Sequence, residues 1–309
     1  MAAIAPWLRI GTRGSALALY QAHAVRDRLA AAHGLAPDDI AIVTIRTSGD
    51  RIQDRPLAEA GGKGLFTKEI EEALLAGTID LAVHSAKDVP SLMPPGLRLA
   101  AYLEREDVCD AFVSVKAASL AELPRGARLG TSSPRRQAIA LRLRPDLTIV
   151  PLRGNVETRL RKLEEDAADA TILALAGLKR LGLERHATRV MSPDEFLPAG
   201  GQGAIAVETR TGDHATNERV ARIGDADTAV TLTAERAFLA VLDGTCKTPI
   251  AAHAIVRSDD VVLRGLILTP DGRSAHEVEL AGRRSDAARL GTAAGQDIKG
   301  RAGPEFFPE

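Results

Sequence analysis

The 309-residue chain has little cysteine and few aromatic residues. Its two cysteines, Cys109 and Cys246, cannot build a disulfide framework or a cysteine-rich metal site, and such low usage is typical of a reducing compartment. The seven histidines are scattered without metal-ligand spacing, so we expect no metal. Aromatic residues make up 3% of the chain and do not alternate with basic residues, which argues against the stacking surfaces of a nucleic-acid binder.

Long apolar runs and a large net charge are also absent. No stretch approaches the ~20 apolar residues of a membrane span. The N-terminus, MAAIAPWLRI, lacks the basic region and apolar run of a signal peptide. Forty Lys and Arg residues against 41 Asp and Glu residues give a net charge of −1, so no global field attracts nucleic acid or membranes. We expect a cytoplasmic protein in which any anion recognition is local.

The first two thirds of the chain alternate strand-like runs with amphipathic helical runs, which predicts α/β units with mainly parallel strands. Three units lead from a strand through a polar turn into a helix. In LRIGTRGSALALYQ the turn holds Arg13 and Ser15, in ARLGTSSPRRQ it holds Thr131 to Ser133 before Pro134, and in LTIVPLRGNVETRL it holds Gly154 and Asn155. Each turn would present free backbone N–H groups, hydroxyls and an arginine at the positive end of a helix dipole, and is therefore a candidate anion site.

Basic residues are concentrated between positions 125 and 162. This segment has ten Arg and Lys residues and two acidic residues, a local charge of +8 that leaves −9 for the rest of the chain. A single such turn is usually an ordinary connection with a solvated arginine. Three of them, at the strand ends where open α/β sheets bind ligands, favour a ligand with several separated anionic groups, since arginine forks bind carboxylate or phosphate oxygens.

Two further segments belong to the same predicted binding region. AEAGGKGLFTKEIEEALLAG places Lys63 between glycines in a loop that we expect to be a mobile cover, followed by a helix capped by Thr67. IDLAVHSAKDVPSLMPPG runs from a buried strand into Lys87 and Asp88. Alone, this pair is either a solvated ion pair or a catalytic pair. A carboxylate at a strand end among cations suits proton chemistry or the binding of a substrate N–H group.

The last third of the chain has a different pattern. The loop in LPAGGQGAIAVETR precedes a strand that could return the chain to the first sheet. DTAVTLTAERAFLAVLDG then predicts an amphipathic helix, and VVLRGLILTPDGRSAHEVEL predicts an antiparallel hairpin around Pro-Asp-Gly. Between them, DGTCKTPI places Cys246 in a polar loop, where on its own it is either a small packing residue or a nucleophile. We expect three domains: residues 1–103 with 204–221, residues 109–197, and a smaller α+β domain of residues 226–309.

Seven motifs along the chain resemble the porphobilinogen deaminase family: GGKGLF, HSAKDVP, GTSSPRRQ, LRGNVETRL, LALAGLKRLGL, LPAGGQGA and DGTCKTPI. The resemblance implies two α/β lobes like those of periplasmic binding proteins and a small C-terminal domain. It also implies a dipyrromethane cofactor attached to Cys246 by a thioether. The implied reaction condenses four porphobilinogen molecules head to tail, each with loss of ammonia, to give hydroxymethylbilane.

The resemblance also implies roles for individual residues. Every pyrrole ring carries an acetate and a propionate, and these carboxylates must be neutralised when a cleft takes them in. The residues implied to bind them are Arg13, Ser15, Thr131, Ser132, Ser133, Arg135, Arg136, Arg153, Arg159 and Arg180, with Lys87 and Gln202 as further contacts and Lys63 and Phe66 in the mobile loop. Asp88 is implied to bind pyrrole N–H groups and to stabilise the cation that forms when ammonia leaves. Cys109 keeps the interpretation of a packing residue.

Two hypotheses from other classes stay open at this level. A non-catalytic small-anion-binding protein with the same two lobes would bind reversibly and form no covalent adduct, but it leaves Asp88 and Cys246 without a role. A nucleic-acid binder would use the basic segment but lacks the aromatic residues for stacking. With the enzyme, we expect porphobilinogen as the partner, no nucleic acid, no membrane, and a monomer.

Overall fold

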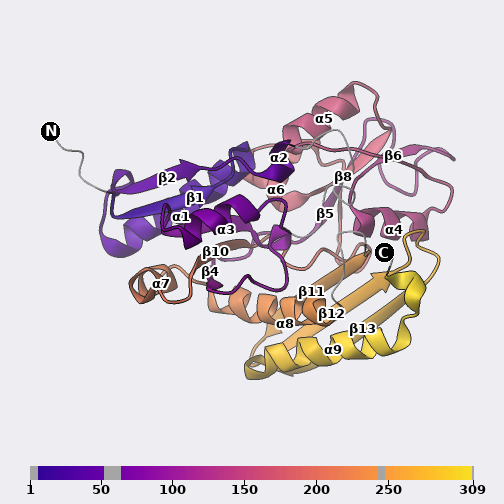
Figure 1. Ribbon diagram of the computed structural model, residues 1–309. Helices are drawn as coiled ribbons and strands as arrows, with labels where there is room; N and C mark the ends of the chain where they lie inside the picture. The colour runs from indigo at the N-terminus through magenta and orange to yellow at the C-terminus, as the bar shows by residue number, and fades with distance from the viewer. Residues whose placement is uncertain (1–5, 52–63, 243–247, 308–309) are drawn as a thin grey trace. The chain divides into compact units, whose positions relative to one another are not determined.

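The computed structural model describes residues 6–51, 64–242 and 248–307 (Figure 1). The described residues form two compact units. The N-terminal unit takes its residues from Met1–Ile52, Gly64–Arg105 and Ala204–Ala229, and the C-terminal unit takes its own from Glu106–Gly203 and Val230–Glu309. No helix of the described ranges is long and apolar enough to cross a membrane.

The N-terminal unit is built on a five-stranded sheet in the order β2-β1-β3-β10-β4. The strands are β1 (Leu8–Thr12), β2 (Ile40–Thr44), β3 (Leu81–Ser85), β4 (Leu97–Tyr102) and β10 (Ile205–Arg210). Strand β1 is parallel to β2 and β3, and β10 is antiparallel to both of its neighbours. Four strands therefore run in one direction, which confirms the mainly parallel sheet, and β10 does return the chain to the first sheet as predicted.

The helices of this unit are α1 (Ala16–His33), α2 (Ser48–Arg51), α3 (Lys68–Leu75) and α7 (His214–Ala221), with short 3-10 turns η1 (Pro37–Asp39) and η3 (Ala86–Asp88). Ser15 caps α1 as predicted, since its side chain accepts a hydrogen bond from the Ala18 N–H. Apolar residues at helical spacing, including Ala22, Val25 and Leu29, bury one face of α1. Thr67 precedes α3 as predicted, but its side chain makes no capping hydrogen bond.

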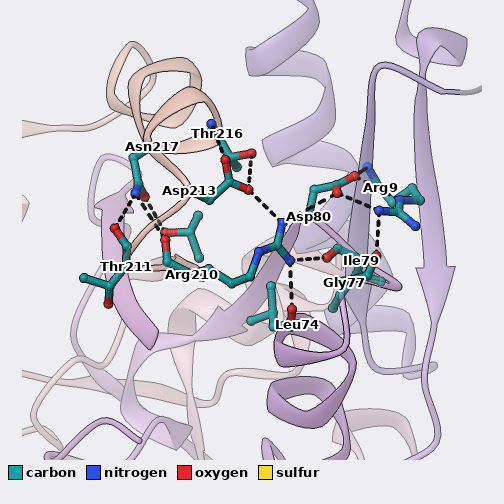
Figure 2. A network of polar contacts seen from close by, with 11 residues as sticks. Arg9, Leu74, Gly77, Ile79, Asp80, Arg210, Thr211, Asp213, Thr216 and Asn217 are labelled. Carbon is teal, nitrogen blue, oxygen red and sulfur yellow. Dashed lines mark hydrogen bonds and ion pairs between the residues drawn. The ribbon is translucent and has the colours of Figure 1, made fainter. Parts of the chain in front are cut away.

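A network of ion pairs lies at one end of the strands of this sheet (Figure 2). Asp80, just before β3, accepts hydrogen bonds from the backbone N–H of Arg9, at 2.8 Å, and from its guanidinium, at 2.7 Å. Arg210, at the end of β10, pairs with Asp213 at 2.7 Å and donates to the carbonyls of Leu74 and Ile79. Because β10 is antiparallel to β3, its end meets the start of β3. The network therefore lies at the start of β3, whereas Asp88 follows the other end of this strand.

The C-terminal unit contains a second five-stranded sheet in the order β7-β6-β8-β5-β9. Its elements are β5 (Asp110–Val113), β6 (Arg128–Gly130), α4 (Pro134–Leu143), β7 (Thr148–Val150), α5 (Val156–Glu164), β8 (Ala170–Ala174), α6 (Leu175–Arg180), η4 (Glu184–His186) and β9 (Arg189–Met191). Only β5 runs against the others, so this sheet is also mainly parallel. Ser133 caps α4 and Pro134 occupies the first position of this helix, as predicted. Asn155, which was predicted to lie in a turn, caps α5.

The same unit contains a three-stranded antiparallel sheet of β11 (Ile250–Arg257), β12 (Asp260–Leu268) and β13 (Ala275–Arg283). Helices α8 (Ala226–Leu242) and α9 (Ala287–Arg301) cover one face, and η5 (Arg284–Asp286) and η6 (Pro304–Phe306) complete the chain. The predicted helix and the β12–β13 hairpin are therefore confirmed. The division into two compact units does not test the three domain boundaries, which stay a prediction.

The glycine-rich turn of LPAGGQGA connects the two units along the chain. Gly201 and Gly203 have φ angles of 78° and 87°, a region that favours glycine. At Gly203 a Cβ atom would lie 2.2 Å from the Glu106 carbonyl oxygen, so no other residue fits there without a shift of the backbone. The motif is explained by this close approach of two backbone segments.

Candidate active site

The N-terminal unit has a small cavity where β1 and β3 end. It has a volume of about 60 Å³, and its lining includes four of the predicted site residues: Arg13, Ser15, Phe66 and Asp88. Arg13 and Ser15 follow β1, whereas Asp88 closes η3 directly after β3. Because these two strands are parallel neighbours, their carboxyl ends lie side by side. Lys87 and Asp88 are exposed, so both side chains are accessible to a ligand.

Arg13 is held from two sides in this cavity. Its guanidinium forms an ion pair with Asp50 and lies over the Phe66 ring, 4.2 Å from the ring centroid. The Thr47 hydroxyl also donates to Asp50, at 2.8 Å. Burial raises the pKa of Asp50, but the hydrogen bonds from Arg13 and Thr47 outweigh it and hold this pKa below its ordinary value. A ligand carboxylate at Arg13 would therefore share the guanidinium with Asp50, which the sequence analysis did not identify.

Gln21 is a second residue that the sequence analysis missed. It lies on α1, is 2% exposed, and lines the cavity beside Ser15 and Asp88. Its side-chain amide donates to the Ser85 hydroxyl at 2.8 Å. The signal in the sequence was a glutamine that shares the apolar face of the helix with Ala18, Ala22 and Val25. A buried amide needs hydrogen-bond partners, which makes such a position a candidate for a polar site.

One wall of this cavity includes a buried histidine that belongs to a group of titratable side chains. His84, which lines the cavity, has its Nε2 atom 2.9 Å from Glu208 Oε2. Glu71 of α3 is electrostatically coupled to both. Burial is the main reason that the pKa of Glu71 is raised, and the Glu208 charge adds to this rise. The interior next to the cavity thus favours an uncharged Glu71.

In the C-terminal unit most of the predicted carboxylate-binding residues lie at or near the starts of α4 and α5. The Thr131 N–H donates to the Val150 carbonyl at 3.0 Å, because β6 and β7 are parallel neighbours. The turn of Thr131, Ser132 and Ser133 therefore lies beside the turn that begins after Val150. Ser132 is exposed, and Ser133 accepts a hydrogen bond from the Arg136 N–H. Two helix N-termini with hydroxyl or amide caps suit carboxylate ligands.

Arg135 and Arg136 are engaged inside the protein. Both are 5% exposed, and both bind the fully buried Asp110, Arg135 at 2.8 Å and Arg136 at 2.7 Å. Burial lowers the pKa of Arg135 although the Asp110 charge opposes this. Two guanidinium groups against one carboxylate leave an excess positive charge at the start of α4. Within the described part of the chain the Nε atom of Arg135 is buried without a hydrogen-bond partner.

The remaining predicted residues of this unit also make protein contacts. Arg159 donates to the Gly154 carbonyl at 2.9 Å, and Arg180 donates to the Gly203 carbonyl at 2.6 Å. Arg153 accepts a hydrogen bond from Lys162 through its carbonyl oxygen. Gln202 is fully buried and donates to the Val108 carbonyl at 2.7 Å. Cys246 and Lys63 lie outside the described residues.

The donor set of each unit fits the dipyrromethane carboxylates that the sequence motifs imply. The C-terminal unit offers capped helix N-termini and an excess positive charge, and the N-terminal unit offers Arg13 and Ser15 beside Asp88. Carboxylates are the anions that guanidinium forks and helix N-termini bind.

Comparisons with known proteins agree with this chemistry. The family model described as porphobilinogen deaminase, dipyromethane cofactor binding domain, matches residues 8–218, and the model of the porphobilinogen deaminase C-terminal domain matches residues 229–300. Curated porphobilinogen deaminases of Nitrobacter hamburgensis and Nitrobacter winogradskyi are each 62% identical over 298 residues, which cover 96% of this chain and 94% of theirs.

Solved structures with some likeness to the chain include two binding proteins. A nutrient binding protein from Burkholderia cenocepacia bound to methionine is 16% identical with a TM-score of 0.44, over 69% of this chain and 89% of its own. A periplasmic substrate-binding protein of an ABC transporter from Coxiella burnetii is 18% identical with a TM-score of 0.44, over 70% of this chain and 91% of its own. The family models and the curated relatives together show that this chain belongs to the porphobilinogen deaminase family.

Proposed function

We propose that Asp88 is the catalytic carboxylate with which this transferase condenses four porphobilinogen molecules, each with loss of ammonia, to hydroxymethylbilane. The observation that carries the proposal is the cavity of the N-terminal unit, which gathers Asp88 with Arg13, Ser15 and Phe66 at the carboxyl ends of two parallel strands. It is the place in this unit where an exposed carboxylate meets groups that suit the carboxylates of a pyrrole substrate.

The charge that develops in the reaction gives Asp88 its role. The C–N bond of the protonated aminomethyl group of porphobilinogen breaks, ammonia departs with the electron pair, and the positive charge of the former ammonium group spreads over the ring nitrogen and the methylene carbon. A fixed carboxylate stabilises such a cation most when water is excluded, and it also accepts a hydrogen bond from the pyrrole N–H. The methylene carbon then forms a bond to the free α-carbon of the acceptor pyrrole, which loses its proton.

Dipyrromethane, held by the Cys246 thioether, would supply the first acceptor pyrrole. A thiol is the side chain best suited to form a stable C–S bond with the electrophile that porphobilinogen gives when it loses ammonia. The carboxylates of the bound pyrroles would be held by Arg13 and Ser15 from the N-terminal unit. In the C-terminal unit the corresponding residues would be Thr131, Ser132, Ser133, Arg135, Arg136, Arg153, Arg159 and Arg180, with Gln202 as a further contact. Lys87 would be a further contact in the N-terminal unit.

The covalent attachment can be tested by intact mass under denaturing conditions with peptide mapping. We expect an added mass of two linked pyrrole units on Cys246, absent from Cys246→Ser and retained in the control Cys109→Ser. An unmodified wild-type chain would be incubated with porphobilinogen to separate apo-enzyme from a binding protein. A folded chain that still gains no adduct would favour the reversible anion-binding protein over the enzyme.

We also propose that the enzyme works as a monomer in the cytoplasm, with porphobilinogen as its partner and without nucleic acid or membrane. The two-cysteine composition supports a reducing compartment, and the net charge of −1 gives no global attraction for polyanions. Light scattering coupled to size-exclusion chromatography would test the monomer. A molar mass that doubles at micromolar concentration would contradict it.

A further inference from the structure

We propose that a second cavity, in the C-terminal unit, binds an ω-amino carboxylate, a small molecule whose apolar chain separates an ammonium group from a carboxylate. The cavity has a volume of about 370 Å³ and is lined by α4, by the segment after β9 and by β12 and β13. None of its lining residues is a proposed catalytic, cofactor-binding or substrate-binding residue of the porphobilinogen reaction.

The floor of this cavity is apolar. Ile139 of α4, Leu197 and Leu266 of β12 line it and belong to a hydrophobic core of the unit. Leu143, at the end of α4, lines the same cavity and is 46% exposed, which is unusual for a large apolar side chain. A ligand with an apolar body would cover this surface and release the water that contacts it.

Most charged groups of the lining already have partners. Arg264 forms an ion pair with Asp194, and its Nε atom lies 3.8 Å from Glu279 Oε2. Glu195 pairs with Arg189 at 2.8 Å. These groups are compensated by the protein itself, so they contribute less to the selection of a ligand.

Arg142 and Glu277 are different. Neither side chain makes a hydrogen bond or an ion pair with the described residues, although both line the cavity. Arg142 comes from α4 and Glu277 from β13, and they do not pair with each other. One unpaired cation and one unpaired anion, on different elements around a cavity with apolar lining residues, match a ligand whose two charges are separated by an apolar chain.

The charge of the whole lining sets an order of affinity. Four carboxylates (Asp194, Glu195, Glu277 and Glu279) and two guanidinium groups (Arg142 and Arg264) give a net charge of −2. The cavity therefore prefers the ammonium group, and Arg142 adds a preference for a carboxylate at the other end. We expect 6-aminohexanoate to bind more tightly than hexylamine, and hexylamine more tightly than hexanoate.

Isothermal titration of the holoenzyme with these three probes tests the proposal. Glu277→Gln is expected to weaken 6-aminohexanoate and hexylamine about fivefold, as expected for the loss of one partly exposed ion pair, and to leave hexanoate unchanged. Arg142→Gln is expected to weaken 6-aminohexanoate by a similar factor and to leave hexylamine unchanged. Both residues are exposed, so neither change should disturb folding.

Two matched controls remove a charge elsewhere in the same unit. Arg125→Gln and Glu164→Gln change exposed residues that do not line the cavity, and they should bind all three probes as the wild type does. Affinities that do not change in the Arg142 and Glu277 variants would place any binding elsewhere and overturn the proposal. Equal affinity for hexylamine and 6-aminohexanoate would overturn the carboxylate part of it.

Discussion

The Nε2 atom of His84 lies 2.9 Å from Glu208 Oε2 in the interior of the N-terminal unit, with both side chains almost fully buried. Glu71 is coupled to this pair, and one carboxyl oxygen each of Glu71 and Glu208 is buried without a hydrogen-bond partner among the described residues. Glu208 contacts the imidazole directly, whereas Glu71 feels the charges of both His84 and Glu208. A protonated Glu71 relieves the repulsion between the two carboxylates.

Glu71→Gln should therefore remove a pH dependence of stability. Because burial raises the pKa of Glu71 above its ordinary value of 4.5, the native protein binds this proton more tightly than the unfolded chain does. The free energy of unfolding of the wild type then falls as the pH rises from 4.5 through the raised pKa. The uncharged glutamine does not titrate, so the variant should match the wild type at pH 4 and be more stable at pH 8.

Urea unfolding at the two pH values measures this difference. Glu72→Gln, which changes the exposed neighbour on α3, is the matched control and should follow the wild type at both. A Glu71→Gln variant whose stability runs parallel to that of the wild type would show that the fold does not raise the pKa of Glu71.

Asp88→Asn should abolish most of the turnover and leave the binding of carboxylates largely intact. The asparagine keeps the size of the side chain but removes the negative charge that stabilises the cation. We expect kcat to fall at least about 100-fold with little change in KM, the order found when one stabilising group of a transition state is lost. Steady-state assays with porphobilinogen measure both constants, with Asp27→Asn, on α1, as the control. Near-normal turnover would refute the role of Asp88.

Asp110→Asn should destabilise the C-terminal unit strongly. Asp110 accepts hydrogen bonds from the buried guanidinium groups of Arg135 and Arg136, and the amide would leave both charges without a counterion. The expected loss is about 3–5 kcal/mol of the free energy of unfolding. Asp146→Asn, which breaks the more exposed pair with Arg144, should cost little in the same urea titration. Equal losses in the two variants would mean that the buried pair is compensated by other contacts.

Local features of the fold could be predicted from the sequence, whereas the partners of the arginines could not. The caps Ser15, Ser133 and Asn155 depend on hydrogen bonds to groups three residues away, which a sequence pattern contains. Arg13 meets Asp50 from 37 residues away, and Arg135 meets Asp110 from 25 residues away. Such pairs depend on which strands become neighbours, so the sequence predicts the basic turns but not the carboxylates that bind their arginines. Gln21 was missed for the same reason.

Acid should weaken the N-terminal unit through Asp80, the centre of the network in Figure 2. Burial raises the pKa of Asp80, but the hydrogen bonds from the side chain and backbone of Arg9 outweigh it and hold this pKa below 3.8. The stability that this carboxylate contributes is present above the ordinary pKa and is lost as the pH falls through the lowered value. The Asp80→Asn variant should lack this contribution to stability already at pH 7.

The wild type and the Asp80→Asn variant should therefore differ at pH 7 and approach each other as the pH falls below 3.8. Urea unfolding across this range measures the gap, with Asp38→Asn, an exposed residue of η1, as the control. A gap that stays constant down to pH 2 would mean that Asp80 is not titrating in that range.

Cys109 should resist alkylation in the native protein. Burial raises the pKa of its thiol to about 12, and the nearby Asp107 adds to this rise. The thiolate is the reactive form, so at pH 8 very little of the side chain can react. In the Cys246→Ser variant, which leaves Cys109 as the single cysteine, we expect iodoacetamide to react at least about 100-fold more slowly with the native protein than with the chain unfolded in urea, where the thiol regains a pKa of about 8.5. The native rate should rise between pH 8 and pH 10, because the thiol still titrates above that range. Similar rates for the native and unfolded chains would show that Cys109 is accessible as a thiolate, and it would then compete with Cys246 for the electrophile formed from porphobilinogen.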